Sequence, residues 1–358
     1  MDYRKAADRW MKFQDLDQDL RRELERITDE KEWEDRFYTS LTFGTAGLRG
    51  VIGAGTNRMN RYTVRKATQG LAQFILKQGE EARKKGVVIA YDCRHQSPEF
   101  AKEAGLVLAQ NGIKAYVFDE LRPTPELSFA VRYLGTAAGI MITASHNPPE
   151  YNGYKVYGPD GAQIAADMAD AVMGEIERVP NELTVPIMPL EKARAAGLYE
   201  VIGETIDNVY QQRLRALAMQ PSRNNRDLKI VYTPLHGTGN KPVRRILKDL
   251  GFQHVQVVQE QEKPDPDFST VRSPNPEEHE AFTLAIEMAE QTGADLIMGT
   301  DPDADRVGVV VRDETGEFSV LTGNQLGALF LEYILSQRKE RGELPDNGVV
   351  IKTIVTSE

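Results

Sequence analysis

Residues 143–155 read Thr143-Ala144-Ser145-His146-Asn147-Pro148-Pro149-Glu150-Tyr151-Asn152-Gly153-Tyr154-Lys155, directly after an apolar run at 139–142. The apolar run is typical of a buried strand, so a serine hydroxyl stands where that strand ends. The two prolines exclude an ordinary helix or central strand immediately afterwards. A rigid loop that carries Ser, His, Asn and Lys is typical of a reactive site. By itself the pattern is equally consistent with a turn that uses Ser and Asn as local hydrogen-bonding residues.

On both sides of this loop, predicted strands and helices alternate. This alternation with short loops indicates an α/β fold that contains parallel strand pairs, in which ligands gather at the carboxyl ends of the strands. Residues 180–203 show little periodicity and are interpreted as the irregular end of a first domain. The predicted strands are 86–91, 113–118, 140–142, 154–157, 229–233, 255–258, 296–299, 306–311, 318–321 and 349–355. The predicted helices are one or two within 1–40, then 61–78, 99–111, 125–134, 164–179, 206–219, 241–250, 277–291 and 324–338.

Composition limits the class of protein. A chain of 358 residues exceeds one ordinary core and predicts at least two domains. The net charge of -10 argues against a nucleic-acid-binding surface, although a local basic pocket for a small anion is still compatible with it. The single cysteine, Cys93, allows no internal disulfide and favours a reducing compartment. No apolar leader or membrane span is recognisable in the sequence, so we expect a soluble, cytoplasmic protein.

Three further loops are candidates for ligand contacts. In Gly44-Thr45-Ala46-Gly47-Leu48-Arg49-Gly50, glycines allow close approach of the backbone while Arg49 offers a planar fork; the alternative is a flexible loop with a solvated arginine. Arg94 follows another predicted strand, so Arg94 and Ser145 could face one crevice. His236 lies in Pro234-Leu235-His236-Gly237-Thr238-Gly239-Asn240, a strand-to-helix turn whose N–H groups could hold an anion. A structural role for His236 is equally consistent with the pattern.

The acidic loop Asp301-Pro302-Asp303-Ala304-Asp305-Arg306 directly follows an apolar strand. Alternate aspartates in an extended loop converge on one side and offer oxygen ligands to a hard divalent cation, which would relieve their mutual repulsion. The alternative is a solvated acidic turn. An EF-hand does not fit, because Arg306 stands where that loop requires glycine. An aspartyl nucleophile of the haloacid-dehalogenase type would use Asp301 and Asp303 but would leave Asp305 and the serine loop unexplained.

These patterns can be combined into one chemistry. A cation held by three aspartates lacks a fourth anionic ligand, and a phosphorylated serine would supply one. Arginine side chains would hold the equatorial oxygens of the phosphoryl group during transfer. Lys155 and His146 are the nearby groups that can move a proton to or from a hydroxyl. A Ser–His–Asp hydrolase is disfavoured, because no Gly-x-Ser-x-Gly elbow surrounds Ser145.

The serine loop, the acidic loop and the glycine–arginine loop together resemble the α-D-phosphohexomutase superfamily. The stretches at 148–157 and 233–238 are similar to its bacterial phosphoglucomutase/phosphopentomutase branch. The resemblance implies successive three-layer α/β/α domains with mixed sheets and an active-site cleft between domains. It also implies small phosphorylated sugars as partners, with no nucleic acid and no membrane; it leaves the oligomeric state open.

The resemblance further implies residue roles. Ser145 would carry the transferable phosphate, and Asp301, Asp303 and Asp305 would bind Mg²⁺ together with a phosphoserine oxygen. Arg49 and Arg306 would steady the phosphoryl group, His146 and Lys155 would serve as acid/base groups, and Arg94 and His236 are further substrate-binding candidates. The implied reaction moves phosphate between C1 and C6 of glucose, with glucose 1,6-bisphosphate as intermediate and activator.

Family members have four domains. The expected division is a phosphoserine domain at 1–203, a metal-binding domain at 204–322 and the start of a sugar-recognition domain at 323–358, with the fourth, phosphate-binding domain absent. We therefore expect weak or no turnover from this chain alone. A phosphopentomutase acting on ribose or deoxyribose 1- and 5-phosphates is the first alternative. A non-catalytic module that binds phosphosugars or Mg²⁺ is the second.

Overall fold

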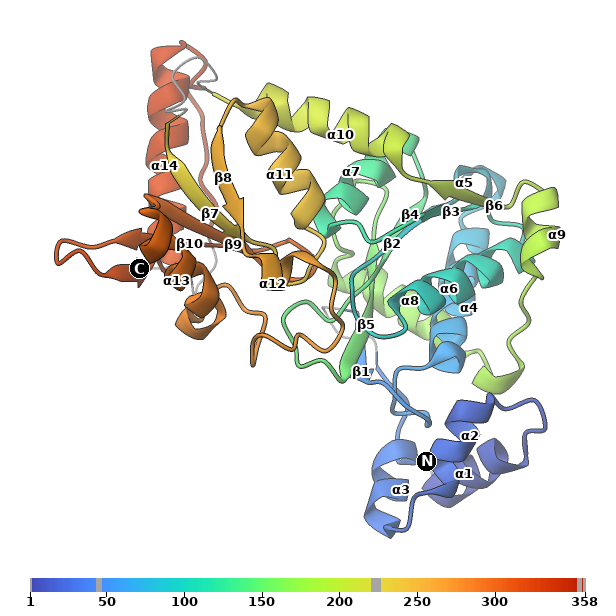
Figure 1. The fold of residues 1–358 in the computed structure, drawn as a ribbon. Helices are drawn as coiled ribbons and strands as arrows, with labels where there is room; N and C mark the ends of the chain where they lie inside the picture. The colour runs from blue at the N-terminus through green and yellow to red at the C-terminus, as the bar shows by residue number, and fades with distance from the viewer. Residues whose placement is uncertain (1, 43–46, 220–226, 353–355, 357–358) are drawn as a thin grey trace. The chain divides into compact units, whose positions relative to one another are not determined.

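The computed structural model describes residues 2–42, 47–219, 227–352 and 356, which divide into two compact units (Figure 1). The first unit comprises Met1–Tyr210 and the second Gln211–Glu358. The division therefore falls after Tyr210, whereas the sequence predicted a boundary after Gly203. Residues 323–352 are grouped with the second unit.

Three short helices begin the first unit, where the sequence predicted one or two: α1 (Tyr3–Lys12), α2 (Gln18–Glu25) and α3 (Glu30–Phe37). An aspartate caps each of them by accepting a hydrogen bond from a backbone N–H of its first turn. The helices enclose a small core around Trp10, whose side chain is fully buried. The Trp10 indole donates a 2.8 Å hydrogen bond to Glu182 Oε1, which ties this core to the rest of the unit.

The first unit is built on a mixed sheet with the strand order β1-β5-β4-β2-β3-β6. Strands β4, β2, β3 and β6 run parallel, whereas β5 is antiparallel to both of its neighbours. The parallel pairs confirm the α/β prediction. Residues 180–203 were wrongly predicted to be irregular, because β6 lies within them and pairs with β3. The strands are β1 (Leu48–Val51), β2 (Val87–Tyr91), β3 (Ala115–Phe118), β4 (Ala138–Ile142), β5 (Tyr151–Tyr157) and β6 (Tyr199–Ile202).

Helices cover both faces of this sheet. Val87 and Ile89 of β2 belong to one apolar core, and Val88 and Ala90 belong to another, as the two-residue period of a strand requires. The first core includes side chains of α4, α6 and α8, and the second includes side chains of α7 and the start of α10. The helices are α4 (Arg61–Lys77), α5 (Glu80–Lys85), α6 (Ser97–Gln110), α7 (Thr124–Leu134), α8 (Ala166–Glu177), the 3₁₀ helix η1 (Glu182–Thr184), α9 (Leu190–Ala195) and α10 (Glu204–Leu217).

The second unit contains a five-stranded sheet with the order β11-β10-β9-β7-β8. Strands β9, β7 and β8 are parallel, and β10 and β11, which correspond to the predicted strands at 306–311 and 318–321, form a hairpin at one edge. Val231, Ile297 and Val310 pack against α13 in the main core. The elements are β7 (Lys229–Thr233), α11 (Asn240–Asp249), β8 (His254–Val257), α12 (Gln259–Glu262), η2 (His279–Phe282), α13 (Thr283–Thr292), β9 (Leu296–Thr300), β10 (Val307–Arg312), β11 (Phe318–Val320) and α14 (Gly323–Glu340).

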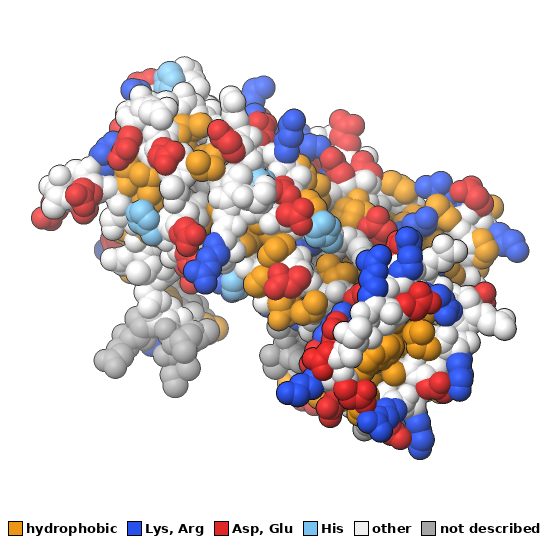
Figure 2. Space-filling view, turned by 60° about the horizontal axis from the view of Figure 1, so that its bottom comes forward, with side chains coloured by type: hydrophobic (Ala, Val, Ile, Leu, Met, Phe, Trp, Pro, Cys, Tyr) orange, Lys and Arg blue, Asp and Glu red, His pale blue; other side chains and the backbone are white. Residues whose placement is uncertain are grey.

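A strand predicted at 349–355 is not seen at 349–352, and its last three residues lie outside the described part of the chain. Acidic and basic side chains are intermingled over the face drawn in Figure 2. Among the described residues, no helix has the length and hydropathy that crossing a bilayer requires.

Candidate active site

Ser145 lies in the turn that follows β4, at the carboxyl end of a strand in the parallel part of the first sheet. Its backbone is left-handed, with φ of 51°, which is uncommon for a residue other than glycine and must be stabilised by its surroundings. The Ser145 N–H donates a 2.8 Å hydrogen bond to Thr143 Oγ1, and Thr143 Oγ1 donates a 2.6 Å bond to Asp92 Oδ2. The serine turn is therefore held from the neighbouring strand β2.

Two candidate acid/base groups stand beside this turn. The Nδ1 atom of His146 lies 3.2 Å from the Ser145 hydroxyl oxygen. Lys155 lies on β5, opposite Met141 of β4 in the register, and its residue is only 5 % exposed. The structure thus places both predicted groups on the elements that flank the serine.

Arg49 was predicted to lie in a glycine-rich loop, but it lies on strand β1, which pairs with β5. Its Nη1 donates a 2.6 Å hydrogen bond to Asn147 Oδ1 in the serine loop. One glycine of the predicted loop, Gly47, is required by the structure. Its φ is 88°, and a Cβ at this position would lie 2.3 Å from the carbonyl oxygen of Tyr154. Residues 44–46 of the predicted loop lie outside the described part of the chain.

Arg94 has a different position from the one expected of a substrate contact. Its side chain is 0 % exposed and lies 3.4 Å from the Asp92 carboxylate. The guanidinium donates hydrogen bonds to backbone carbonyl oxygens of the serine loop instead of facing a crevice. The predicted direct role in binding substrate is not supported by this burial.

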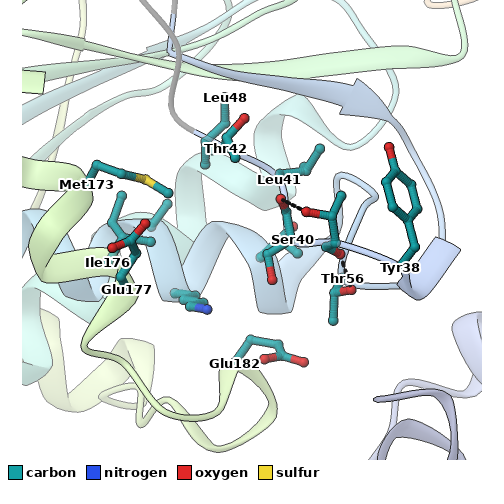
Figure 3. Close-up of a pocket in the computed structure, with 14 residues that line it drawn as sticks. Tyr38, Ser40, Leu41, Thr42, Leu48, Thr56, Met173, Ile176, Glu177 and Glu182 are labelled. Carbon is teal, nitrogen blue, oxygen red and sulfur yellow. Dashed lines mark hydrogen bonds between the residues drawn. The ribbon is translucent and has the colours of Figure 1, made fainter. Parts of the chain in front are cut away.

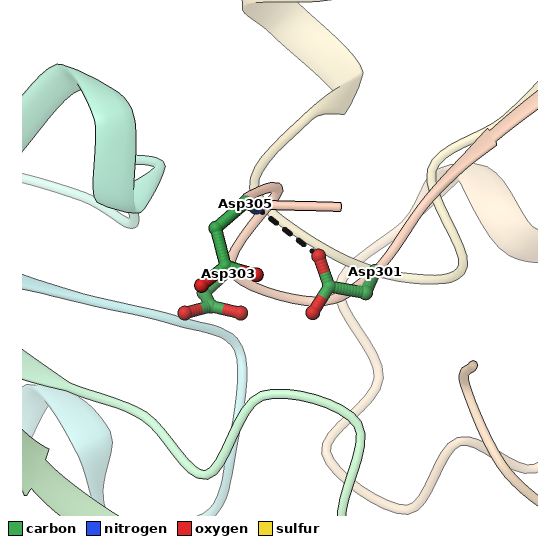
Figure 4. Close-up of side chains that lie close together, drawn as sticks. All are labelled: Asp301, Asp303 and Asp305. Carbon is green, nitrogen blue, oxygen red and sulfur yellow. Dashed lines mark hydrogen bonds between the residues drawn. The ribbon is translucent and has the colours of Figure 1, made fainter. Parts of the chain in front are cut away.

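In the second unit, the three aspartates of the acidic loop converge as predicted (Figure 4). Each offers a carboxylate oxygen within 4.8 Å of the others, and Asp301 and Asp303 are fully buried. The loop folds tightly because Asp301 Oδ1 accepts hydrogen bonds of 3.1 Å from the backbone N–H groups of Asp305 and Arg306. Three carboxylates at this spacing fit a hard divalent cation, which takes oxygen ligands and offsets their repulsion.

The other two predicted residues of this unit have different surroundings. Arg306 is partly exposed next to the aspartates, 3.7 Å from Glu277. His236 is 2 % exposed; its Nδ1 donates to the Lys263 carbonyl at 2.9 Å, and its Nε2 lies 2.8 Å from Thr270 Oγ1. Both ring nitrogens of His236 are therefore engaged within the protein, which favours the structural interpretation of this residue.

A separate pocket of about 350 Å³ lies in the first unit (Figure 3). It is lined by residues 38–42 and by side chains of α4 and α8, including Lys66, Met173 and Ile176. Ser145, His146, Lys155 and Arg49 are not among the lining residues, so this pocket is distinct from the serine turn.

Comparisons with known proteins show which family this chain belongs to. The sequence profile of phosphoglucomutase/phosphomannomutase α/β/α domain I matches residues 40–182, and that of domain II matches residues 208–316. The phosphoglucomutase of Staphylococcus haemolyticus is 43% identical over 325 residues, which is 91% of this chain and 58% of the relative. The phosphoglucomutase of Staphylococcus aureus strain N315 is 43% identical over 327 residues, 91% of this chain and 57% of the relative. This chain belongs to the α-D-phosphohexomutase superfamily.

Solved structures share the fold of this chain. A protein described as a phosphomannomutase from Thermus thermophilus is 29% identical, with a TM-score of 0.66 over 85% of this chain and 62% of that chain. A phosphoglucomutase/phosphomannomutase family protein from Burkholderia thailandensis shares the fold at 24% identity, with a TM-score of 0.64 over 81% of this chain and 58% of that chain. The chain spans less than two thirds of these relatives' lengths.

The residues that support the site were not predicted from the sequence. Asp92 accepts hydrogen bonds from the Thr143 and Ser97 hydroxyls and from the Arg94 N–H. Asn147 is the partner of Arg49. Asp92 could have been found from its position in the sequence. It directly follows a buried strand and precedes Arg94 by two residues, and functional polar groups gather at the carboxyl ends of parallel strands.

Proposed function

We propose that this chain carries the phosphoserine and the metal-binding loop of a phosphosugar mutase that moves phosphate reversibly between C1 and C6 of glucose. The supporting observation is the Ser145 turn: a buried serine in a left-handed turn after β4, with His146 Nδ1 at 3.2 Å and Lys155 on the adjoining strand. The relatives named phosphoglucomutase favour glucose phosphates as substrates.

In the proposed reaction, a phosphoryl group leaves Ser145 Oγ for a sugar hydroxyl. The bond from phosphorus to the serine oxygen breaks and a bond to the sugar oxygen forms; the proton of the sugar hydroxyl passes to a base, and the departing serine oxygen takes up a proton from an acid. Transfer in the reverse sense from the other end of glucose 1,6-bisphosphate restores the phosphoserine. His146 and Lys155 are the proposed groups that take and return the proton.

The negative charge of the phosphoryl group also has to be stabilised during transfer. Arg49, on β1, and Arg306, the last residue of the acidic loop, are the proposed contacts to the phosphoryl oxygens. Bound by Asp301, Asp303 and Asp305 together with an oxygen of the phosphoserine, Mg²⁺ would withdraw charge from the phosphoryl group. Small phosphorylated sugars are the proposed partners and the cytoplasm the proposed location, supported by the single cysteine.

The test is intact-mass measurement after incubation with glucose 1,6-bisphosphate and Mg²⁺. We expect the wild-type chain to gain one phosphate and Ser145→Ala to gain none. Ser128→Ala is the matched control, since Ser128 is a serine of α7 in the same unit whose hydroxyl donates to the Gly161 carbonyl; it should gain phosphate as the wild type does.

The other outcomes separate the alternatives. No gain in the wild type, together with saturable binding of the sugar bisphosphate, would favour a non-catalytic binding module. Faster uptake from ribose 1,5-bisphosphate than from the glucose compound would favour a phosphopentomutase. Mutase turnover is measured separately from phosphate uptake. The chain spans only 58% of the length of the Staphylococcus haemolyticus relative, and we expect weak or no turnover from it alone.

A further inference from the structure

The most unusual feature of the first unit is the environment of Arg94, in the turn between β2 and α6. Its side chain is fully buried. The two terminal nitrogens contact four carbonyl oxygens of a single loop: Nη2 donates to Ser145 O at 2.7 Å and Asn147 O at 2.5 Å, and Nη1 donates to Pro148 O at 2.8 Å and Tyr151 O at 3.0 Å. A guanidinium has four terminal N–H donors in a fixed plane, which matches these four acceptors in number.

This contact fixes the shape of the loop. Four carbonyl dipoles that point toward one place repel one another, and buried carbonyls without donors are costly, so the loop requires a cation with several donors at its centre. Ser145 needs such support in particular, because its left-handed backbone is intrinsically unfavourable. Lysine has the charge but offers its donors from a single atom, so it cannot span carbonyls from residue 145 to residue 151.

Asp92 connects Arg94 to the other support of the serine. One of its oxygens, Oδ2, accepts from Thr143 Oγ1 and lies 3.4 Å from Arg94 Nε, and Thr143 Oγ1 accepts the Ser145 N–H. The serine is therefore held through its N–H by the Thr143–Asp92 pair and through its carbonyl by Arg94. Both supports come from the end of β2.

We propose that Arg94 is a positioning residue that sets the Ser145 loop for phosphate transfer through the loop carbonyls, without touching the sugar. The predicted effect of Arg94 on phosphate transfer rests on the proposed function of the chain. The geometric part, that Arg94 holds residues 143–153 in place, stands independently of it.

The test compares Arg94→Lys with Arg122→Lys. Arg122 is the matched control, since it is another buried arginine of the first unit, with ion pairs to Asp119 and Asp207 and a hydrogen bond to the carbonyl of Leu121. Two measurements are made on each variant: hydrogen–deuterium exchange of peptides that cover residues 143–153, and the rate of phosphate uptake from glucose 1,6-bisphosphate per folded protein. We expect Arg94→Lys to speed exchange in this loop and to slow uptake about 100-fold. Arg122→Lys should change neither, even where it lowers the melting temperature as much.

The outcomes are distinguishable. If the wild type takes up no phosphate, the proposed function fails, and the positioning role is judged by exchange alone. Exchange of residues 143–153 at the wild-type rate in folded Arg94→Lys would overturn the inference. Phosphate uptake at the wild-type rate in Arg94→Lys would also overturn it, as would an equal loss of uptake in Arg122→Lys.

If Arg94→Lys does not fold, the wild-type protein still provides a test. With ¹⁵N-labelled arginine, the terminal N–H groups of Arg94 should give separate NMR signals that are protected from exchange as strongly as the loop amides. Fast-exchanging, averaged terminal N–H signals for every arginine would overturn the inference.

Discussion

At the scale of single residues, the acidic loop is defined by its carboxylates. Asp303 is fully buried and lies with Asp301 and Asp305 in the only acidic cluster of suitable spacing among the described residues. A buried carboxylate is costly unless it is compensated, and a divalent cation compensates several at once. The burial thus gives the predicted metal site a physical basis that the sequence spacing alone does not provide.

We predict that Asp303→Asn weakens Mn²⁺ binding, measured by electron paramagnetic resonance, by at least about 10-fold. The substitution keeps the shape of the side chain but removes a negative charge and one strong ligand. The rise in melting temperature that Mg²⁺ produces by binding the folded state should be lost as well. Asp249→Asn, at the exposed end of α11, is the control and should leave both unchanged. Equal Mn²⁺ affinity in Asp303→Asn and the wild type would contradict the assignment of this residue as a ligand.

At the scale of elements, the loop after β7 supports the acidic loop after β9. Thr238 donates two hydrogen bonds to the Pro302 carbonyl, one from its N–H at 2.9 Å and one from its hydroxyl at 3.0 Å. Gly237 allows this approach, because a Cβ there would lie 2.5 Å from Pro302 Cα. The two loops follow neighbouring parallel strands, so their positions are set by the register of β7 and β9.

We therefore predict that Gly237→Ala lowers Mn²⁺ affinity about 10- to 100-fold, although residue 237 is not a ligand, because the added methyl group pushes the two loops apart. The control is Gly327→Ala in α14, where a Cβ meets nothing within 4 Å. That variant should keep its Mn²⁺ affinity and gain about 0.5–1 kcal/mol of stability from the better helix former. Unchanged Mn²⁺ binding in Gly237→Ala, measured by calorimetry, would show that the loops do not cooperate.

How much of this could be predicted from sequence differs between elements. The apolar runs of β2, β4 and β9 are long and flanked by polar loops, so these strands were found, together with Ser145 after β4 and the aspartates after β9; Asp92, directly after β2, was missed. Strand β6 was missed because it is an edge strand with exposed Glu200 and Val201, which removes the apolar signal. Strand β1 was missed because Arg49 and Gly50 are not typical strand residues. They form a strand only because they pair with β5.

The same limit applies to the roles of side chains. The sequence shows that Arg94 follows a strand. The direction of its side chain, however, is set by contacts with the serine loop and β5, which lie more than fifty positions further along the chain. His236 is comparable, since Lys263 and Thr270 engage its ring only in the folded chain. Ser145 and the three aspartates could be predicted as site residues because their residue types and spacing point to a chemistry without knowledge of the tertiary contacts.

At the scale of the whole molecule, both units bury tyrosines in their cores. Tyr91 is 8 % exposed, and burial raises its pKa to about 12. Burial likewise raises the pKa values of Tyr154 and Tyr210 in the first unit and of Tyr232 in the second. The hydroxyls of Tyr154 and Tyr232 also pair with those of Thr68 and Thr300, at 3.1 and 2.8 Å; these hydrogen bonds lower the two pKa values, but burial outweighs them. The folded state therefore favours the neutral form of these tyrosines in both units.

This preference predicts unfolding in alkali. The pKa of Tyr91 is about 12 in the folded state against an ordinary value of 10.0, so its contribution is fully present below pH 10 and is lost as pH rises toward 12. The other three tyrosines act in the same direction. In a pH titration followed by tyrosinate absorbance and circular dichroism, exposed tyrosines should ionise first without loss of structure. The buried ones should ionise together with unfolding. Tyr91→Phe should unfold at higher pH than the wild type, whereas Phe in place of the exposed Tyr133 should not. Ionisation of every tyrosine in one step, with helical structure intact, would contradict this account.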